Sequence, residues 1–442
     1  MKTTIRSFIG KMSRMSKLVM ATATLAAVGG APSDSHAVNG TLSGCVTTTE
    51  VRTNPSPNNP GRLWTSQVGD GMPIRRALIR LRFFFGAEFF TSTNNAGCYT
   101  INWNDPLSLF FPVNAELGVI LASPDMPLGT QQTSSPNRLF TIHNGPLFGD
   151  FVAETRNVAM NANTTQNVTV AGAGTSEPRA AYMTTQEFYA RVVNQSTAFL
   201  NTMKNVHVHV NSTPAAPGVA GGIAPTTSDV FLTGGTATAS AFTVAHELGH
   251  IVAWRSLGVV TVPFRADFLD FACDGVVVPA HGWDSLECQK AAWNEGFAHF
   301  VGAAWMWARN AQNPVIPQDE ANGFDLENEL CDTPNVGNEC SHAKALWDIY
   351  DNPAGDDDGI ANRSMASITQ VLRGYTDFCI VPFVSDNRCS NEGDPLGANS
   401  FDFNALNHLD FRGNWATVLG ATQIPQINAI YTQNAVIGGD PS

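Results

Sequence analysis

The chain has 442 residues, of which 43% are hydrophobic, so it is long enough for two or three domains that each bury a core. This composition excludes a protein that is disordered as a whole. With 38 acidic against 25 basic residues, the formal net charge is -13, and such a surface repels nucleic acid and anionic membranes. We therefore expect neither a nucleic-acid partner nor membrane insertion.

Residues 1–37 have the pattern of a secretory signal peptide. Lys and Arg residues precede the apolar run LVMATATLAAVGGA, and Ser35-His36-Ala37 supplies small residues around a cleavage site. The apolar run is too short to span a bilayer comfortably. Cleavage after Ala37 would leave 20 Lys and Arg against 37 Asp and Glu, a net charge of about -17. We therefore expect a protein secreted to the extracellular space or the periplasm.

The chain contains eight cysteines, an even number, which in an exported protein indicates disulfide bonds. None of them follows a CxxC zinc spacing, and the sequence leaves their connectivity open. Short loops close at the least entropic cost, so the simplest hypothesis pairs neighbours along the chain. These pairs are Cys45 with Cys98, Cys273 with Cys288, Cys331 with Cys340 and Cys379 with Cys389.

Residues 38–170 are rich in Thr, Asn, Gly and Pro and contain short alternating runs. ALIRLRFF, at 77–84, alternates apolar and basic residues as a half-buried strand does. FFTSTNNAGCYTINW predicts a strand, a turn at 94–97 and a second strand, and several such units predict a small β-sandwich. The order of GTLSG, MPIRRALIRLRF and TSTNNAGCYTI resembles the transthyretin-like or carboxypeptidase-regulatory-like sandwich, which implies an accessory domain.

The composition changes after AGAGTSEP, at 171–178, which is typical of a linker. The capping-box pattern at 184–187 predicts a helix through Phe199. A strand NVHVHVN, a second strand DVFLTGG at 229–235 and the helical AFTVAHELGHIVAWRSL follow, and helices dominate the rest. We therefore expect residues 179–442 to form an α+β domain with a helical lower part.

The stretch HELGH contains two histidines one helical turn apart. His246 and His250 would project side by side and could bind one ion, with Glu247 next to it. Zinc suits imidazole ligands and leaves positions for a third ligand and a water. The metzincin pattern HExxHxxGxxH is excluded, because Ala253 and Ser256 replace its Gly and last His.

Glu295, in the helical segment WNEGFAHFVGAAWMWA, follows His250 after 44 intervening residues. HELGH followed by NEGFAHF resembles the gluzincin clan of zinc metallopeptidases, whose best-known member is thermolysin, from about Thr184 to the C-terminus. The resemblance implies a zincin-like domain in which His246, His250 and Glu295 bind Zn²⁺. It also implies that Glu247 is the general base, which takes a proton from a zinc-activated water and passes it to the departing amine.

The chain departs from the gluzincin pattern at two places. The position four residues after the ligand glutamate is usually an acid that accepts a hydrogen bond from a zinc histidine, but here it is His299, whose neutral ring could accept the same bond. No later segment matches the residue that helps to stabilise the oxyanion. His342 and Tyr350, in CSHAKALWDIYDN, are the candidates. The strand at 229–235 would bind an extended peptide by edge pairing, and the segment at 251–294 would shape the groove.

Two further patterns permit a metal site but favour a simpler interpretation. His207 and His209 alternate on one strand, and a polar strand face is favoured over a second metal site. The acidic run at 356–358 could hold Ca²⁺, although it fits no full EF-hand and a solvated loop is favoured.

The predicted protein is multidomain, with an N-terminal all-β sandwich followed by an α+β zincin-like catalytic domain. Its predicted function is that of a secreted zinc metalloendopeptidase acting on polypeptides. The alternative is a non-catalytic zinc-containing binding or adhesion protein on the same scaffold, against which the intact Glu247 argues. Zinc-dependent hydrolysis of a non-peptide substrate is a third possibility that the ligands alone leave open.

Overall fold

The structure is a computed structural model of the 442-residue chain. It describes residues 39–49, 72–84, 86–104, 114–146, 149–160, 163–212, 222–224, 226, 228–256, 283, 289–317, 321, 323–332, 334, 337–351, 363–373, 415 and 421–436. The predicted signal peptide, the acidic run at 356–358, most of the predicted groove segment and the pairs Cys273–Cys288 and Cys379–Cys389 lie outside the described residues.

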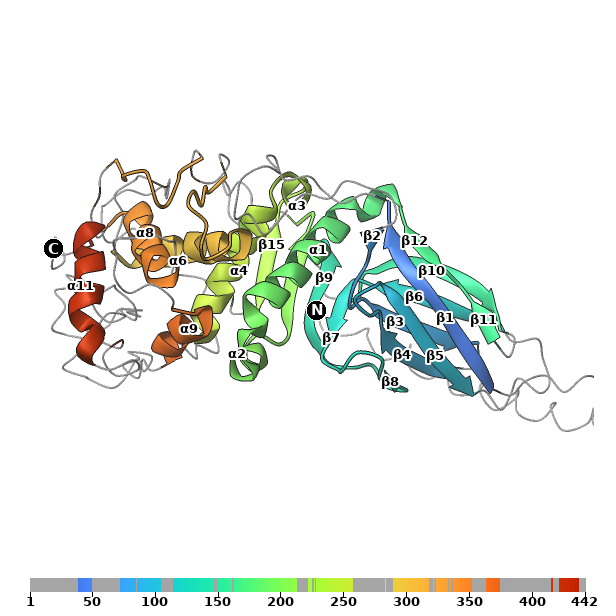
Figure 1. The fold of residues 1–442 in the computed structure, drawn as a ribbon. Coiled ribbons are helices and arrows are strands. Elements are labelled where there is room, and N and C mark those ends of the chain that lie inside the picture. The colour runs from blue at the N-terminus through green and yellow to red at the C-terminus, as the bar shows by residue number, and fades with distance from the viewer. Residues whose placement is uncertain are drawn as a thin grey trace, which may run out of the picture.

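The described part is a multidomain mixed α/β fold with three sheets. Figure 1 shows two sheets at one end of the molecule, helices at the other end, and the helices α1 and α4 between them. The helices are η2 (Ala173–Thr175), α1 (Ser176–Arg191), η3 (Val193–Gln195), α2 (Thr197–Thr202), α3 (Thr236–Ala239), α4 (Ala241–Ser256), α6 (Gln289–Met306), α8 (Glu339–Tyr350), α9 (Met365–Arg373), η4 (Ala421–Gln423) and α11 (Ile424–Gln433).

The first two sheets pack face to face. In the first, β1 (Asn39–Thr48) pairs with β2 (Met72–Pro73), β5 (Cys98–Asn104), β11 (Asn163–Thr165) and β12 (Val168–Val170). The second has the order β10 (Val152–Ala159), β6 (Asn114–Ile120), β3 (Leu78–Phe83), β4 (Glu88–Ser92) and β8 (Gln131–Gln132). Phe83 of the second sheet and Trp103 of the first meet with ring centroids 5.7 Å apart in one buried core.

The alternation predicted for residues 77–84 is confirmed in β3. Its apolar side chains are buried, whereas Arg82 is exposed and Arg80 donates to Glu116 at 2.9 Å. The strand, turn and strand predicted around 94–97 are also present. However, β4 and β5 do not pair with each other, and the turn carries the chain from one sheet to the other.

The third sheet joins strands from both halves of the chain. Its order is β14 (Gly222–Ile223), β15 (Asp229–Leu232), β13 (Val206–Val210), β9 (Arg138–Asn144) and β7 (Ala122–Pro124), with β13 parallel to β9 and β15. Two of these strands lie within the predicted accessory domain, so this sheet crosses the predicted division at residue 170. Local patterning marks a strand but does not specify its partner, because pairing depends on residues distant in sequence.

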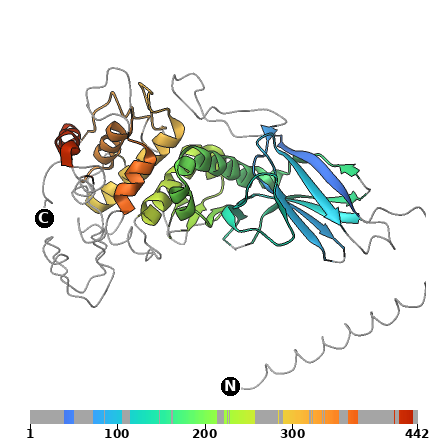
Figure 2. The same cartoon turned by 60° about the horizontal axis from the view of Figure 1, so that its bottom comes forward.

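Apolar side chains on one face of the third sheet form the core under two helices. Phe140 and Ile142 pair in register with Val206 and Val208, and all four are buried. The ring of Tyr189 from α1 lies 4.9 Å from that of Phe140. Helices α1 and α4 contact each other as they cover this face (Figure 2).

The segment at 171–178 is not an extended linker. It contains η2 and the first residues of α1, which begins at Ser176 and ends at Arg191 rather than running from Thr184 to Phe199. The expected capping residues Thr184 and Thr185 are buried inside α1. Ser196 instead caps α2, by accepting a hydrogen bond from the Phe199 N–H. Arg179 is buried and donates to Thr48 and to the Val170 carbonyl, which ties α1 to the first sheet and explains the early start of the helix.

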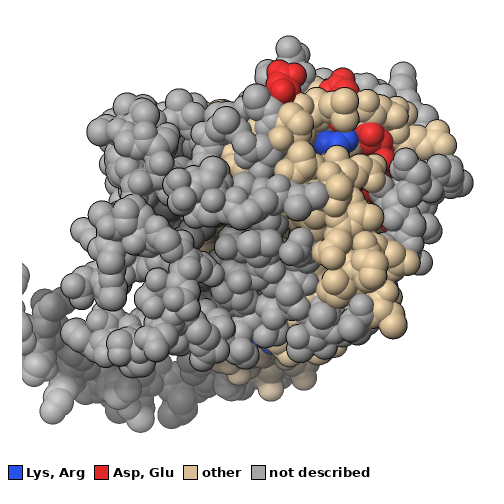
Figure 3. Space-filling view, turned by 90° about the vertical axis from the view of Figure 1, so that its left-hand side faces the viewer, with Lys and Arg blue, Asp and Glu red and all other residues tan. Residues whose placement is uncertain are grey.

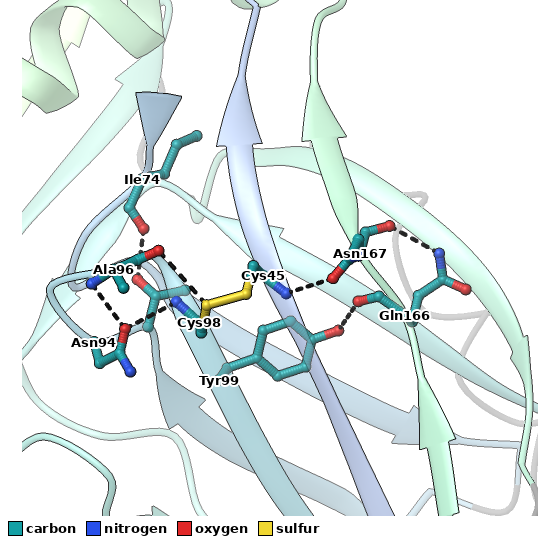
Figure 4. The surroundings of a disulfide bond; sticks show 9 residues. Cys45, Ile74, Asn94, Ala96, Cys98, Tyr99, Gln166 and Asn167 are labelled. Atoms are coloured by element: carbon teal, nitrogen blue, oxygen red, sulfur yellow. Dashed lines mark hydrogen bonds between the residues drawn. A yellow bond between two sulfur atoms is a disulfide. The ribbon is translucent and has the colours of Figure 1, made fainter. Parts of the chain in front are cut away.

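Two of the predicted disulfides are confirmed. Cys45 and Cys98 are direct cross-strand neighbours on β1 and β5, and Asn167 accepts a hydrogen bond from the Cys45 N–H at 2.9 Å (Figure 4). Cys331 and Cys340 join the segment before α8 to its first turn. Both bonds fit an extracellular protein. Among the helices that the structure describes, none is long and apolar enough to cross a membrane.

Candidate metal centre

The histidines of HELGH and the glutamate of NEGFA meet between α4 and α6. The His246 Nε2 atom lies 3.2 Å from His250 Nε2 and 3.1 Å from Glu295 Oε2. His250 Nε2 lies 3.3 Å from the same Glu295 oxygen. The three potential ligand atoms therefore form a nearly equilateral triangle, and the predicted ligands are brought together.

This triangle has the size that a tetrahedral zinc ion requires. Zinc bonds of about 2.0–2.1 Å at tetrahedral angles place ligand atoms about 3.3–3.4 Å apart. The two histidine side chains are buried and that of Glu295 is 11% exposed, so the potential ligand atoms are removed from most of the solvent. These residues could hold a metal ion. Within the described part of the chain, no other group of three or more His, Cys, Asp or Glu residues brings its potential ligand atoms this close together.

Two glycines let the helices approach closely enough to form the site. A Cβ at Gly249 of α4 would lie 2.9 Å from the Ala298 Cα atom of α6. A Cβ at Gly296 would lie 2.6 Å from the Glu339 carbonyl oxygen and 2.6 Å from the His342 Cβ of α8. Real Cβ atoms do not come this close to backbone atoms, so the glycines beside the two ligand positions set the spacing of three helices.

The electrostatics of the triangle suit a cation. Burial by itself lowers the pKa of His246, but the hydrogen bond to Glu295 and the negative charges of Glu295 and Glu247 outweigh it, and the pKa is raised above 6.5. Without a metal, the negative charges of Glu295 and Glu247 therefore favour a proton on His246. A metal ion would replace this proton.

His299 lies beside the triangle but does not make the predicted hydrogen bond to His246. The two rings meet edge to face with centroids 4.4 Å apart. His299 Nδ1 lies 3.0 Å from the Glu295 carbonyl oxygen and 3.7 Å from Glu339 Oε2. Burial and the nearby His246 hold the pKa of His299 well below 6.5, so its ring is neutral.

Two ring nitrogens next to the triangle are buried without a hydrogen-bond partner among the described residues. They are His246 Nδ1 and His299 Nε2. The aromatic ring of Trp283 lies against His299, with ring centroids 5.0 Å apart, and shields this side of the site.

The other predicted site residues lie at different distances from the triangle. Glu247 is buried on α4 beside His246. His342 is buried where α8 contacts Gly296, next to the candidate ligand Glu295. Tyr350 lies two turns further along α8 than His342, about 12 Å from it along the helix axis. It packs against Phe300, with ring centroids 5.6 Å apart.

Sequence reasoning missed Glu339, which is 1% exposed and lies at the first position of α8. Its nearness to His299 depends on how α8 packs on α6, so no local pattern signals it. The Asn338 side chain caps α8 by accepting from the Ser341 N–H, and the motif Asn338-Glu339 could have been read as the start of this helix.

A second histidine cluster lies on the face of the third sheet opposite α1. His143 Nε2 is 2.9 Å from His207 Nδ1, and the rings of His143 and His209 stack with centroids 4.5 Å apart. His209 contacts the Gly145 carbonyl oxygen at 3.2 Å and Asp229 at 3.3 Å. Both ring nitrogens of His143 and of His209 contact other protein groups. Sequence analysis did not include His143, which parallel pairing places beside His209.

No protein-family model matches the chain, and no curated protein is significantly similar to it in sequence.

Charged side chains are few among the described atoms on one face of the helical end of the molecule. On the face of the helical end that Figure 3 shows, the described atoms are mostly uncharged, with acidic side chains beside a basic one. The described atoms of this face form no broad basic patch of the kind that binds nucleic acid.

Proposed function

We propose that the protein is a secreted zinc metalloendopeptidase of the gluzincin type. The observation that carries this proposal is the triangle of His246 Nε2, His250 Nε2 and Glu295 Oε2, with sides of 3.1–3.3 Å. Two nitrogen ligands and one carboxylate, with Glu247 next to the first ligand, are the set that zinc hydrolases of this type use. The disulfides support an extracellular location.

In this proposal each residue of the site has a chemical role. Zinc held by His246, His250 and Glu295 would supply Lewis acidity, making a water molecule more acidic and polarising a peptide carbonyl group. Glu247 takes a proton from the water as the water oxygen attacks the carbonyl carbon. The C–N bond then breaks, and Glu247 delivers the proton to the departing amine nitrogen. His342 is the better placed of the two candidates for helping the developing oxyanion, because α8 contacts the ligand helix at Gly296.

The proposed function also implies a division of the chain into two domains. We assign the first two sheets to an N-terminal β-sandwich accessory domain, and the third sheet with α1 and the later helices to a zincin-like catalytic domain. Face-to-face packing of the first two sheets around Phe83 and Trp103 supports the former. A sheet flanked by the helix that carries HELGH supports the latter.

The peptide-binding edge needs a correction. The predicted edge strand at 229–235 ends at Leu232, and β14 already pairs with it at Phe231 and Leu232. Among the described residues, the outermost strand at this end of the sheet is β14, which is antiparallel to β15. An extended substrate would therefore pair with Gly222–Ile223 rather than with β15.

The alternative function is that of a non-catalytic zinc-containing binding or adhesion protein. The observation in its favour is His299, which replaces the usual acid and makes no hydrogen bond to His246. Loss of support for a zinc ligand is compatible with a scaffold that keeps the metal and lacks turnover.

The deciding experiment combines metal analysis and proteolysis on the purified secreted protein. We expect about one zinc per chain by mass spectrometry and cleavage of a mixture of unfolded proteins. Glu247→Ala should keep the zinc and lose cleavage, whereas the matched surface variant Glu154→Ala should retain both. Zinc without cleavage in the wild type would support the binding protein, and absence of zinc would contradict both functions. Mapped cleavage sites in a peptide library separate peptidase activity from other hydrolysis.

A further inference from the structure

We infer that His299 and Glu339 act together as positioning residues for the metal ligand His246. The carboxylate of Glu339 comes from α8, whereas the ligand Glu295 is on α6. The inference rests on the proposed zinc site. It assigns a role to the buried Glu339 and to the replacement of the expected acid by His299.

The hydrogen-bonding capacity of the two histidines is complementary. When His246 Nε2 binds a metal, its ring proton must be on Nδ1, which becomes a donor. His299 Nδ1 lies 3.0 Å from the Glu295 carbonyl oxygen, which can only accept, so His299 Nδ1 carries the proton. His299 Nε2 is then left with a lone pair and becomes an acceptor.

This donor and this acceptor lie next to each other in a buried place. Both atoms are shielded from solvent and have no hydrogen-bond partner among the described residues. The two rings are 4.4 Å apart at an interplanar angle of 70°. A small rotation of one ring, or one bridging water, would join His246 Nδ1–H to His299 Nε2. Metal binding, which orients His246, supplies the reason for that rotation.

Glu339 reinforces the placement of the His299 proton on Nδ1, which the Glu295 carbonyl oxygen already accepts. Its Oε2 atom lies 3.7 Å from His299 Nδ1, and the residue is 1% exposed. A carboxylate at this position favours the proton on Nδ1 and leaves Nε2 free to accept. The contact of the Glu339 backbone with α6 at Gly296 holds the carboxylate in place.

The arrangement therefore runs from Glu339 through His299 to His246. In the gluzincin pattern, an acid four residues after the ligand glutamate contacts the zinc histidine directly. Here the acid comes from α8 and the imidazole of His299 spans the distance. This predicts that Glu339 affects metal binding only when His299 is present.

The test measures the Kd of the full-length secreted protein for Zn²⁺ by competition with a chromophoric chelator. Glu339→Gln and His299→Leu should each weaken zinc binding by about 10-fold to 100-fold. The double variant should be no weaker than His299→Leu alone. Asp348→Asn, a change of another buried carboxylate on α8, should leave the Kd unchanged.

A rescue experiment separates positioning from folding. His299→Asp in the Glu339→Gln background places an acid beside His246 and should restore the zinc Kd to within about threefold of wild type. Thermal unfolding of the metal-free proteins identifies a variant that does not fold. If Glu339→Gln alone does not fold, Glu339→Asp keeps the charge with a shorter reach and should bind zinc more weakly than wild type.

The outcomes distinguish this inference from the proposed function. Wild type that binds no zinc would contradict both. Zinc binding that is equally tight in wild type and Glu339→Gln, or additive losses in the double variant, would overturn the inference while the proposed zinc site stands. Non-additive losses with rescue by His299→Asp would support it.

Discussion

Gly249 of α4 lies against Ala298 of α6 so closely that a Cβ at Gly249 would be 2.9 Å from the Ala298 Cα and 3.0 Å from its carbonyl oxygen. The glycine directly precedes the candidate ligand His250, and Ala298 lies three residues after the candidate ligand Glu295. The contact therefore fixes the distance between the two helices that carry the potential metal ligands. Any side chain at this position would move one ligand helix away from the other.

Gly249→Ala tests this contact. Alanine normally favours a helix over glycine by about 0.8–1 kcal/mol, so an uncrowded position would become more stable. Here we expect a net loss of about 1–3 kcal/mol in the free energy of unfolding, because the added methyl group meets backbone. Urea unfolding measures this loss, and zinc affinity should fall as well. Gly118→Ala, where the nearest atom would be 3.6 Å away, serves as the control. A Gly249→Ala protein with unchanged stability and affinity would contradict the predicted role.

Glu295→Gln should remove zinc binding. It keeps the shape of the side chain but removes the charge that offsets a buried cation, and we expect the zinc Kd to rise by more than about 100-fold. Isothermal titration of the metal-free protein with Zn²⁺ measures the change. Glu187→Gln, which breaks the ion pairs of Glu187 with Arg75 and with Arg191, should bind zinc as the wild type does. Tight binding by Glu295→Gln would remove Glu295 from the ligand set.

Metal removal should lower the thermal stability of the protein. A ligand that binds the folded state stabilises it by about 2.7 kcal/mol at a free concentration 100 times its Kd. Treatment with a chelator should therefore lower Tm, and added zinc should restore it. The His246→Ala protein provides the control, because its Tm should respond to neither treatment. A chelator effect of equal size in that variant would place the stabilising metal elsewhere.

Acid should destabilise the protein through His143. Burial, followed by the charge of the stacked His209, lowers the pKa of His143 from 6.5 to about 4. Because this folded-state pKa is below the unfolded value, the unfolded chain binds the proton first as the pH falls. The stabilising contribution is complete above pH 6.5 and is lost as the pH falls toward about 4.

Two measurements check this prediction. In NMR titration the ring signals of His143 should change near pH 4. His143→Gln should flatten the decrease of Tm between pH 6.5 and pH 4. A His143 signal that titrates at 6.5 or above would show that the cluster does not hold this ring neutral.

Loss of the Cys45–Cys98 bond should cost more stability than loss of Cys331–Cys340. The sequence separations are 53 and 9 residues, and the longer loop loses more entropy in the unfolded chain when it is closed. The chain-entropy model gives about 4 kcal/mol for the first and about 2.7 kcal/mol for the second. Urea unfolding of the two double Cys→Ser variants compares them, and the reverse order would indicate that local packing dominates.

The sequence by itself was sufficient for features that depend on local periodicity. The helical repeat of 3.6 residues predicts that His246 and His250 lie on the same side of α4, and the structure has them there. Alternation at 77–84 predicts which face of β3 is buried. The sequence left the cysteine connectivity open, and the structure confirms two pairs of the simplest hypothesis, Cys45–Cys98 and Cys331–Cys340.

Identifying Glu295 as the third candidate ligand required more than periodicity. The motif resemblance singled out Glu295, and only the packing of α4 on α6 gave its distance of 3.1 Å from His246. No spacing rule predicts this distance, because 44 residues of chain separate His250 from Glu295.

Tertiary structure alone decided the relationships between elements that are distant in sequence. It placed β9 beside β13, so that His143 meets His207 and His209, and it put β14 on the edge where β15 was expected. It also brought Glu339 of α8 to within 3.7 Å of His299. Strand partners and helix crossings are set by the complementarity of whole faces, to which many distant residues contribute at once. Local patterns show which face of an element is buried, but the fold decides what that face meets.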